Sequence, residues 1–294
     1  MKAVLFPGQG SQVVGMGKNH YDQNEHFREY VNKADLVLGI SLSEIMFEGP
    51  EDRLRQTEFT QPAIFVHSVA LFSTLNEEPD MVAGHSLGEF SALVAAGAIE
   101  FEDALAIVRK RGKLMQQAGK INPGTMAAVI GMDDTDVEDA CHDASEATGL
   151  DVVAANYNCP GQLVISGHEA AVDMAIDLLK ERGCKLAKKL PVSGAFHSPL
   201  MQPAYEGLRE KLQSLKIKTP KCSVYANYTG KPTIDTGEIR SNLLNQLLNP
   251  VRWTQTLQQM HKDGTTEFTE IGPGSVLQGL VKRTLKNVQI NGFQ

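Results

Sequence analysis

Cysteine is scarce in this sequence, and its spacing excludes two kinds of structure. The chain has four cysteines in 294 residues. None forms a C-x-x-C pair, and no histidine stands at ligand spacing from them. Neither a zinc site nor a disulfide framework is therefore indicated. We expect no metal, and we expect the four to be free thiols of the reducing cytoplasm: Cys141, Cys159, Cys184 and Cys222.

Long apolar runs and basic tracts are also lacking. No stretch approaches the length of a membrane span, and the first apolar run is too short for a signal peptide. The formal net charge is −7, and the basic clusters, such as 109–111 and 188–189, are short and lack interleaved aromatic residues. We therefore expect a cytoplasmic protein with neither nucleic acid nor membrane as a partner. With 42% hydrophobic and 21% charged residues, the composition is that of an ordinary globular protein.

The apolar pattern contains no repeats and predicts strands that alternate with helices. Such alternation is typical of a parallel sheet covered on both faces. We expect strands at 3–6, 80–83 and 267–270, and helices at 25–38, 61–75, 87–96, 102–117, 199–215, 241–248 and 253–261. Residues 291–294 match no pattern and are expected to be a frayed tail.

The pattern changes after Asn122-Pro123-Gly124. From there the predicted order is strand, helix, strand, strand, helix, strand, and the turn at 158–161 makes the middle strands a hairpin. This is the order of a ferredoxin-like unit. We therefore predict an α/β core made of residues 1–123 and 193–294, with a ferredoxin-like insert over 124–192.

Residues 84–88 (Gly-His-Ser-Leu-Gly) carry a G-x-S-x-G pattern between an apolar strand and an amphipathic helix. In that position the turn lifts Ser86 to its apex, and the following helix points free N–H groups at the hydroxyl. An isolated G-x-S-x-G is common by chance. Its place between a strand and a helix favours a nucleophilic serine over a plain turn.

A nucleophilic serine needs a base, and the chain has eight histidines. His85 adjoins the serine, but neighbours on a tight turn diverge, and His67 lies in an apolar helix as a core residue would. His197 lies in a loop of small residues where the insert ends, and active sites favour such seams. Position alone leaves the choice of base open. The other histidines lie in polar contexts typical of the surface: His20, His26, His142, His168 and His261.

An oxyanion hole needs two backbone N–H groups. The N–H of Leu87 follows the serine directly, and the loop at 8–10 (Gly-Gln-Gly) nominates Gln9 as the second donor. The alternative interpretation of this loop is a dinucleotide site. Val13 stands where the third glycine of that motif belongs, and no acidic residue follows at the required distance, so we disfavour it.

A series of motifs along nearly the whole chain resembles the successive signatures of the malonyl-CoA:acyl-carrier-protein transacylases, relatives of the acyltransferase domains of polyketide synthases. Agreement of so many motifs in order is hard to ascribe to chance. They are 6–12 (FPGQGSQ), 84–89 (GHSLGE), 111–116 (RGKLMQ), 158–162 (NCPGQ), 195–201 (AFHSPLM), 249–253 (NPVRW) and 270–274 (EIGPG).

The resemblance implies an α/β-hydrolase-like core with a ferredoxin-like insert, which agrees with the pattern above. It implies an acyltransferase that moves a malonyl group from malonyl-CoA to acyl carrier protein by a ping-pong route, for fatty-acid chain elongation. Ser86 would be the nucleophile, His197 the base, and the main-chain carbonyl of Gln246 would orient the imidazole. Gln9 and Leu87 would hold the oxyanion. We expect a monomer without a cofactor, since malonyl-CoA is a substrate.

The resemblance also assigns two residues to the substrate. Arg111 would bind the malonyl carboxylate through two parallel hydrogen bonds, although by spacing alone it would be a surface helix residue. Phe196 would exclude an α-methyl branch, although it is otherwise an ordinary core residue. The chain departs from the family at Cys159, where serine is frequent, and at 194–195, where bulkier residues precede the aromatic.

Two other functions are compatible with parts of the sequence. A serine esterase or thioesterase would share the turn, but it places an acid between serine and histidine, and none stands out here at a strand end. A catalytically inactive docking module has no reason to keep Ser86, His197 and Arg111. An acidic carrier protein would need a basic surface, for which the candidates are Arg182, Lys185, Lys188, Lys189, Lys282, Arg283 and Lys286. The sequence does not choose between a fatty-acid and a polyketide carrier.

Overall fold

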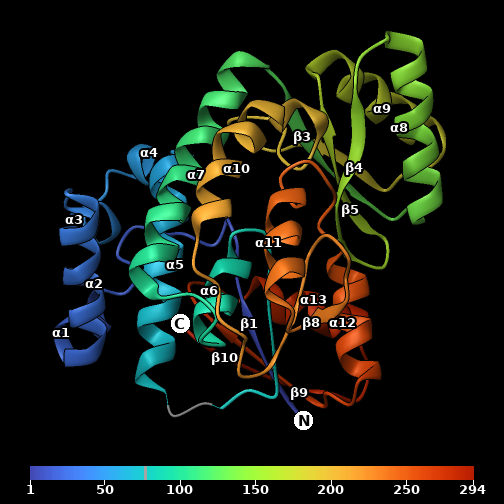
Figure 1. Ribbon diagram of the computed structural model, residues 1–294. Coiled ribbons are helices and arrows are strands. Elements are labelled where there is room, and N and C mark those ends of the chain that lie inside the picture. Colours follow the sequence, from blue (N-terminus) through green and yellow to red (C-terminus); the bar gives the residue numbers. More distant parts are fainter. Residues whose placement is uncertain (76–77) are drawn as a thin grey trace.

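The computed structural model describes residues 1–75 and 78–294 and contains two separate sheets (Figure 1). The larger sheet has six strands in the order β10-β9-β1-β2-β7-β8. Its strands pair in parallel, except that β8 runs antiparallel to β7. The strands are β1 (Lys2–Phe6), β2 (Met81–Gly84), β7 (Ser223–Tyr225), β8 (Pro232–Thr233), β9 (Glu267–Ile271) and β10 (Gln289–Phe293).

Alternation along the strands divides the core of this part between the two faces of the sheet. Val4 and Phe6 of β1 belong to one hydrophobic cluster, whereas Ala3 and Leu5 belong to another. The first face packs against α6 (Gly88–Ala95) and α5 (Thr57–Thr74). The same hydrophobic cluster continues outward into α2 (Glu25–Leu38), α7 (Phe101–Ile121), α10 (Gln202–Ser214) and α11 (Thr236–Asn245). The second packs against α12 (Trp253–Lys262) and α13 (Val276–Thr284). A parallel sheet covered on both faces is what the alternating pattern predicts, so the α/β class is confirmed.

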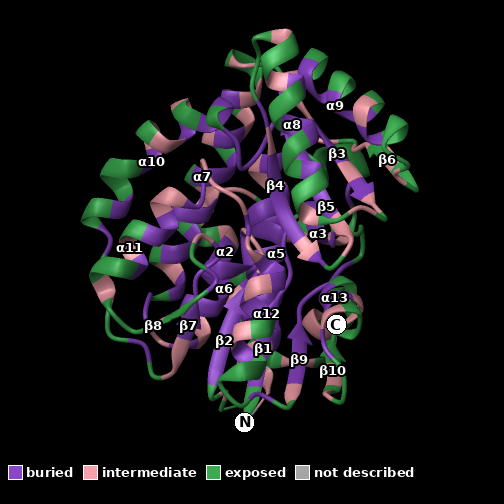
Figure 2. Cartoon of the chain, turned by 90° about the vertical axis from the view of Figure 1, so that its right-hand side faces the viewer, coloured by how far each residue is buried: buried purple, intermediate pink, exposed green. Residues whose placement is uncertain are grey.

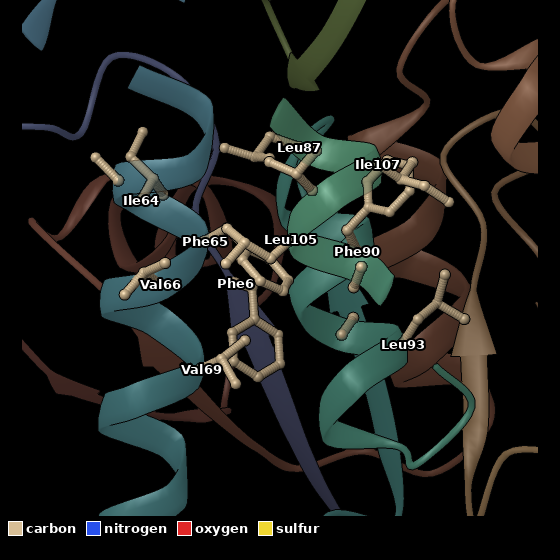
Figure 3. Close-up of a cluster of buried hydrophobic side chains, with 14 of the residues drawn as sticks. Phe6, Ile64, Phe65, Val66, Val69, Leu87, Phe90, Leu93, Leu105 and Ile107 are labelled. Atoms are coloured by element: carbon tan, nitrogen blue, oxygen red, sulfur yellow. The ribbon is translucent and has the colours of Figure 1, made fainter. Parts of the chain in front are cut away.

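Figure 3 shows the first of these clusters at the point that supports the functional site. Phe6 lies between side chains of α5 and α6, and Leu87 is directed into the same apolar layer. Helix α5 is apolar almost all round, which explains why it is buried along nearly its whole length. Shorter helices complete the N-terminal part: α1 (Lys18–Gln23), α3 (Leu42–Phe47) and α4 (Glu51–Leu54).

The smaller sheet lies at the other end of the molecule with its own two helices (Figure 2). Its order is β4-β5-β3-β6, and all its pairs are antiparallel. Along the chain the elements are β3 (Thr125–Ile130), α8 (Asp134–Thr148), β4 (Val152–Cys159), β5 (Gln162–Gly167), α9 (Glu169–Glu181) and β6 (Leu186–Lys189). The order of elements is the one predicted, and they enclose a separate hydrophobic cluster. The domain boundaries at 124 and 192 stay a prediction.

Backbone hydrogen bonds join the smaller sheet to the rest of the molecule. The N–H of Tyr157 in β4 donates to the carbonyl of Val251 at 2.9 Å, and the N–H of Val251 donates to Ala155 at 2.9 Å. Val251 directly precedes the segment that leads into α12. The strand that carries residues 156 and 158 is thereby held in register with the larger part of the chain.

The C-terminal segment differs from the prediction. Helix α13 and strand β10 were not expected, and residues 291–293 are not frayed, because β10 pairs in parallel with β9 from Gln289 to Phe293. The edge position of β10 explains the error. Most of its residues are exposed, so its sequence lacks the apolar alternation that predicts a strand. Helix α10 is also shorter than expected, since a 3₁₀ turn (Pro199–Met201) precedes it.

The larger sheet brings several loops together at one edge. Parallel strands all end at the same side, and in open α/β sheets ligands bind outside those carboxyl ends. The loop after β1 begins with Pro7-Gly8, β2 ends at Gly84, and β7 is followed by Ala226-Asn227. In the described part of the chain, no helix is both long enough and apolar enough to cross a membrane.

Candidate active site

The turn between β2 and α6 places Ser86 at the carboxyl end of a central strand. Ser86 has φ of 52°, a left-handed conformation that non-glycine residues seldom adopt. The flanking glycines make the turn possible: a Cβ at Gly84 would lie 1.9 Å from the carbonyl carbon of Gly88, and one at Gly88 would lie 2.1 Å from the carbonyl oxygen of Phe6. The G-x-S-x-G pattern is therefore a consequence of close backbone packing. The turn holds the serine hydroxyl at the surface of a pocket.

An imidazole contacts the serine from the segment after the smaller sheet. His197 Nε2 lies 2.8 Å from Ser86 Oγ, and His197 Nδ1 lies 2.8 Å from the carbonyl oxygen of Gln246. A carbonyl only accepts, so Nδ1 must carry the hydrogen and Nε2 is left to accept from the hydroxyl. Gln246 is the C-cap of α11, where helix carbonyls lack an intrahelical partner. The helix end thus supplies the group that sets the tautomer.

The imidazole is electrically neutral in this setting. His197 is 3% exposed, and burial, followed by the charge of Arg111, lowers its pKa to about 3. The hydrogen bond to Gln246 opposes that shift because it favours the protonated ring. Neutral imidazole is the form that accepts a proton.

Arg111 is buried directly beside Ser86, although its position on a charged helix suggests a surface residue. It is 1% exposed on α7. Its Nη2 donates to Ser86 Oγ at 3.1 Å and to Gln246 Oε1 at 2.8 Å, and its Nη1 donates to Gln61 Oε1 at 2.8 Å. Within residues 1–75 and 78–294 its Nε has no hydrogen-bond partner. The guanidinium is therefore oriented by two amides and keeps one buried N–H without a partner among these residues.

A cavity of about 350 Å³ opens beside the serine. Gln9 and Leu87 line it together with Phe196, which is 6% exposed. The loop that carries Gln9 lies close to the serine turn, because a Cβ at Gly8 would lie 2.5 Å from the carbonyl oxygen of His85. The two segments nominated for an oxyanion hole are thus adjacent.

The side chain of His85 is directed toward the smaller sheet and not toward the hydroxyl of its neighbour Ser86. Its Nε2 lies 2.9 Å from Asn158 Oδ1 in β4, and its ring packs 5.4 Å from that of Trp253. This contact links the serine turn to the smaller sheet. The expectation that neighbouring side chains on a tight turn diverge is confirmed, because His85 and Ser86 have different partners.

Three buried polar residues of the site were missed by the sequence analysis. Glu89 Oε2 accepts from Gln246 Nε2 at 2.7 Å and from the backbone N–H of Asn227 at 3.1 Å. Asn227 Oδ1 accepts from the N–H of Ser86 at 2.6 Å, and Gln61 orients Arg111 as described above. Each carried a signal: Glu89 is the only charged residue of α6, Gln61 precedes the apolar run of α5, and Asn227 follows a largely buried parallel strand.

A parallel α/β sheet with a strand–serine–helix turn and an imidazole on the serine is the architecture of α/β-hydrolase-like enzymes that handle acyl groups. Comparison with known proteins agrees. The chain matches the acyl transferase domain family over residues 4–292, and it belongs to that family. It is therefore an acyltransferase, and the resemblance drawn from the motifs is confirmed.

The relatives agree among themselves. The chain is 44% identical over 295 residues to the malonyl CoA-acyl carrier protein transacylase of Bacillus subtilis, covering 98% of this chain and 93% of that protein. The crystal structure of an acyl carrier protein S-malonyltransferase from Vibrio cholerae superposes with a TM-score of 0.95 at 42% identity, covering 100% and 96% of the two chains. A malonyl-transacylase in complex with a type II polyketide acyl-carrier protein has a TM-score of 0.95 at 39% identity, with coverage of 99% and 95%.

Proposed function

We propose that this chain transfers the malonyl group of malonyl-CoA to the phosphopantetheine thiol of acyl carrier protein, through a malonyl ester of Ser86. One observation carries the proposal: a single serine oxygen contacts both a neutral imidazole, at 2.8 Å, and a buried guanidinium, at 3.1 Å. The imidazole can accept the proton of the nucleophilic hydroxyl. The guanidinium can bind the free carboxylate of a dicarboxylic acyl group. The names of the relatives support the same substrate and acceptor.

The first half-reaction forms the acyl-enzyme. Ser86 Oγ bonds to the thioester carbon as its proton passes to His197 Nε2, and the carbonyl oxygen becomes an oxyanion. The backbone N–H groups of Gln9 and Leu87 stabilise that charge, and a single such donor contributes about 2.7–4 kcal/mol. The C–S bond then breaks, and the departing thiolate takes the proton from His197 to leave as CoA.

The second half-reaction repeats these steps with another thiol. The phosphopantetheine thiol gives its proton to His197 and bonds to the ester carbon. The C–O bond to Ser86 breaks, and the serine oxygen recovers the proton. Neither half consumes water or changes oxidation state, so the enzyme returns to its initial form.

Arg111 does more than hold the carboxylate in this scheme. Its positive charge is the second cause that lowers the pKa of His197, after burial. A malonyl carboxylate bound to the guanidinium neutralises that charge and thereby makes the imidazole a stronger base. An acetyl group brings no carboxylate and leaves the base weak. The same contact therefore favours malonyl over acetyl in both binding and reaction.

The carrier protein is proposed to approach over α13. Residues of α13 line the cavity, as does Gln162 at the start of β5, and Arg283 Nη1 donates to Gln162 Oε1 at 2.5 Å. In the smaller sheet's part of the chain, Lys189 is engaged with acidic neighbours, with 2.9 Å to Glu169 and 2.8 Å to Asp173. Because α13 lines the cavity, the exposed basic residues on and just after it are proposed as the contacts for an acidic partner: Lys282, Arg283 and Lys286.

We also propose that the protein works as a cytoplasmic monomer. All groups of the pocket described above come from one chain, and the four cysteines are free. No cofactor is required by the steps above. Within the described residues, no group of three or more histidine, cysteine or acidic side chains is placed to hold a metal ion.

Intact-mass measurement tests the proposal. Wild type mixed with malonyl-CoA is expected to gain one malonyl group, keep it in buffer, and lose it when a carrier protein bearing phosphopantetheine is added. Ser86→Ala is expected to gain nothing. Release of free malonate without an acceptor would instead identify a thioesterase. Parallel additions of a fatty-acid and a polyketide carrier protein show which acceptor discharges the enzyme faster.

A further inference from the structure

The steps of acyl transfer leave one buried acid of the site without a role. Glu89 stands in the first turn of α6, three residues after Ser86, and is 2% exposed. A carboxylate in that place is costly unless hydrogen bonds and charge compensate it. Its Oε2 accepts from the side-chain amide of Gln246 at 2.7 Å and from the backbone N–H of Asn227 at 3.1 Å.

Both partners of this carboxylate are hydrogen-bonded to the backbone of the serine turn. Asn227 accepts from the N–H of Ser86 at 2.6 Å and donates to the carbonyl of Gly84 at 2.7 Å. Gln246 Nε2 donates to the carbonyl of Ser86 at 3.0 Å. Both backbone polar groups of the nucleophile are therefore bound by residues that Glu89 anchors.

Gln246 also connects the carboxylate to the other two reacting groups. Its side-chain oxygen accepts from Arg111 at 2.8 Å, and its main-chain oxygen lies 2.8 Å from His197 Nδ1. Arginine only donates, and a carboxylate only accepts. The amide of Gln246 can satisfy both in one orientation alone, with its oxygen toward Arg111 and its nitrogen toward Glu89. The acid thus fixes this amide in the orientation that Arg111 and the carbonyl of Ser86 also require.

We propose that Glu89 is a positioning residue, whose carboxylate fixes Gln246 and Asn227 and through them holds His197 and Arg111 in line with the hydroxyl of Ser86. This rests on the proposed function, since it assigns a task in that reaction. Burial raises the pKa of Glu89 to about 7, while its two hydrogen bonds and the charge of Arg111 oppose the rise. Assays at about pH 8 keep the carboxylate ionised in most molecules.

Variants of Glu89 separate positioning from simple structural support. Glu89→Ala removes the acceptor, whereas Glu89→Gln keeps an oxygen of the same reach and removes the charge. Glu270 supplies the matched control: it is 1% exposed, and its carboxylate accepts from the backbone N–H groups of Leu277 and Gln278, each at 3.1 Å. The measurement is the acylation rate constant per titrated active site, for malonyl-CoA and for acetyl-CoA.

Glu89→Ala is expected to lower the malonyl rate constant about 10–100-fold, the range seen when residues that orient metal ligands are removed. It should also reduce the preference for malonyl over acetyl, because the Gln246 amide that orients Arg111 is no longer held in place. Glu89→Gln should lose less in rate, because its oxygen still accepts both hydrogen bonds. Glu270→Gln should lower the thermal midpoint and leave the rate per site and the preference at wild-type values.

The outcomes are distinguishable. Wild-type rate constant and preference in both Glu89 variants would overturn the proposal, and so would an equal loss in Glu270→Gln. If Glu89→Ala does not fold, Glu89→Gln decides by the same two quantities, which do not depend on the fraction of folded protein. If wild type itself takes up no malonyl group, the proposed function fails, which is a different result.

Discussion

Replacement of Arg111 by alanine tests the assignment of substrate class most directly. The guanidinium is buried and reaches Ser86 Oγ at 3.1 Å, so the variant removes the cation from the place where the acyl group attaches. A carboxylate held by two parallel hydrogen bonds from arginine gains about 1.5–3 kcal/mol from each. At about 1.4 kcal/mol for a factor of ten, the malonyl rate should fall about 10²–10⁴-fold.

The acylation rate constant of Arg111→Ala with acetyl-CoA should rise or stay near the wild-type value. Acetyl-CoA has no carboxylate to lose, and removal of the positive charge lets the pKa of His197 rise from its depressed value. The assay is the second-order acylation rate constant per titrated active site with malonyl-CoA and with acetyl-CoA. We expect the ratio of the two to fall to about unity. Arg111→Lys keeps the charge without the planar fork and should fall between wild type and alanine.

Arg109→Ala is the matched control on the same helix. Arg109 forms an ion pair with Glu58 at 3.0 Å and packs its guanidinium 4.5 Å from the ring centroid of Phe59. Its loss should reduce stability without changing the malonyl-to-acetyl ratio. The reasoning is refuted if Arg111→Ala keeps the wild-type ratio, or if Arg109→Ala loses it to the same extent.

Three further predictions concern the pocket wall, the serine turn and a buried histidine. Phe196→Ala should enlarge the pocket and favour acylation by methylmalonyl-CoA over malonyl-CoA by about 1–3 kcal/mol, measured as the ratio of the two acylation rate constants. An unchanged ratio would show that Phe196 does not determine specificity. Gly88→Ala should destabilise the protein by about 1–3 kcal/mol or more in urea unfolding, because its Cβ would lie 2.1 Å from the carbonyl oxygen of Phe6; wild-type stability would contradict the packing described. His67 is 2% exposed, and burial, followed by the charge of His20, lowers its pKa to about 3. Its unfolded form therefore binds a proton at pH values where the native form does not, and stability should fall by about 2 kcal/mol between pH 7 and 5 on this account alone. His67→Leu should remove that share, so the pH 7-to-5 loss in unfolding free energy should be smaller than in wild type, and an identical loss would show that His67 does not titrate this way.

Local features of the site could be read from the sequence because they depend on neighbours in the chain. The turn at 84–88 needs glycine where backbones meet, and the contacts that extra Cβ atoms would make are the reason. The order of elements from β3 to β6 also follows from local periodicity and one hairpin turn. Strand β10 was missed because an exposed edge strand leaves little alternation to detect. Helix α13 does carry apolar residues at helical spacing, Leu277, Leu280 and Val281, and was overlooked although that pattern is present.

The direction of Arg111 is not encoded by its neighbours in the same way. Arg109, Lys110 and Arg111 are consecutive, and spacing alone places all three on a charged helix surface. The structure buries Arg111 because α7 packs closely against α5: a Cβ at Gly112 would lie 2.7 Å from the carbonyl oxygen of Thr57. Arg111 faces the serine because it lies on the side of α7 that packs against α5, and because the amides of Gln61 and Gln246 hold its guanidinium there.

By itself, the sequence determined the family, the class of fold and the strand–serine–helix turn, since motifs, periodicity and glycine positions are properties of short segments. Position in the chain left the choice of histidine open, and only the family resemblance nominated His197 and the carbonyl of Gln246. Tertiary structure supplies the contacts of these partners with Ser86 and alone reveals the acid that anchors the amides around it. Those partners come from residues up to 160 positions apart, as in the contact of Gln246 with Ser86. Hydrogen bonds extend only about 3 Å and depend on direction, so they are settled when the sheet and its helices pack and not before.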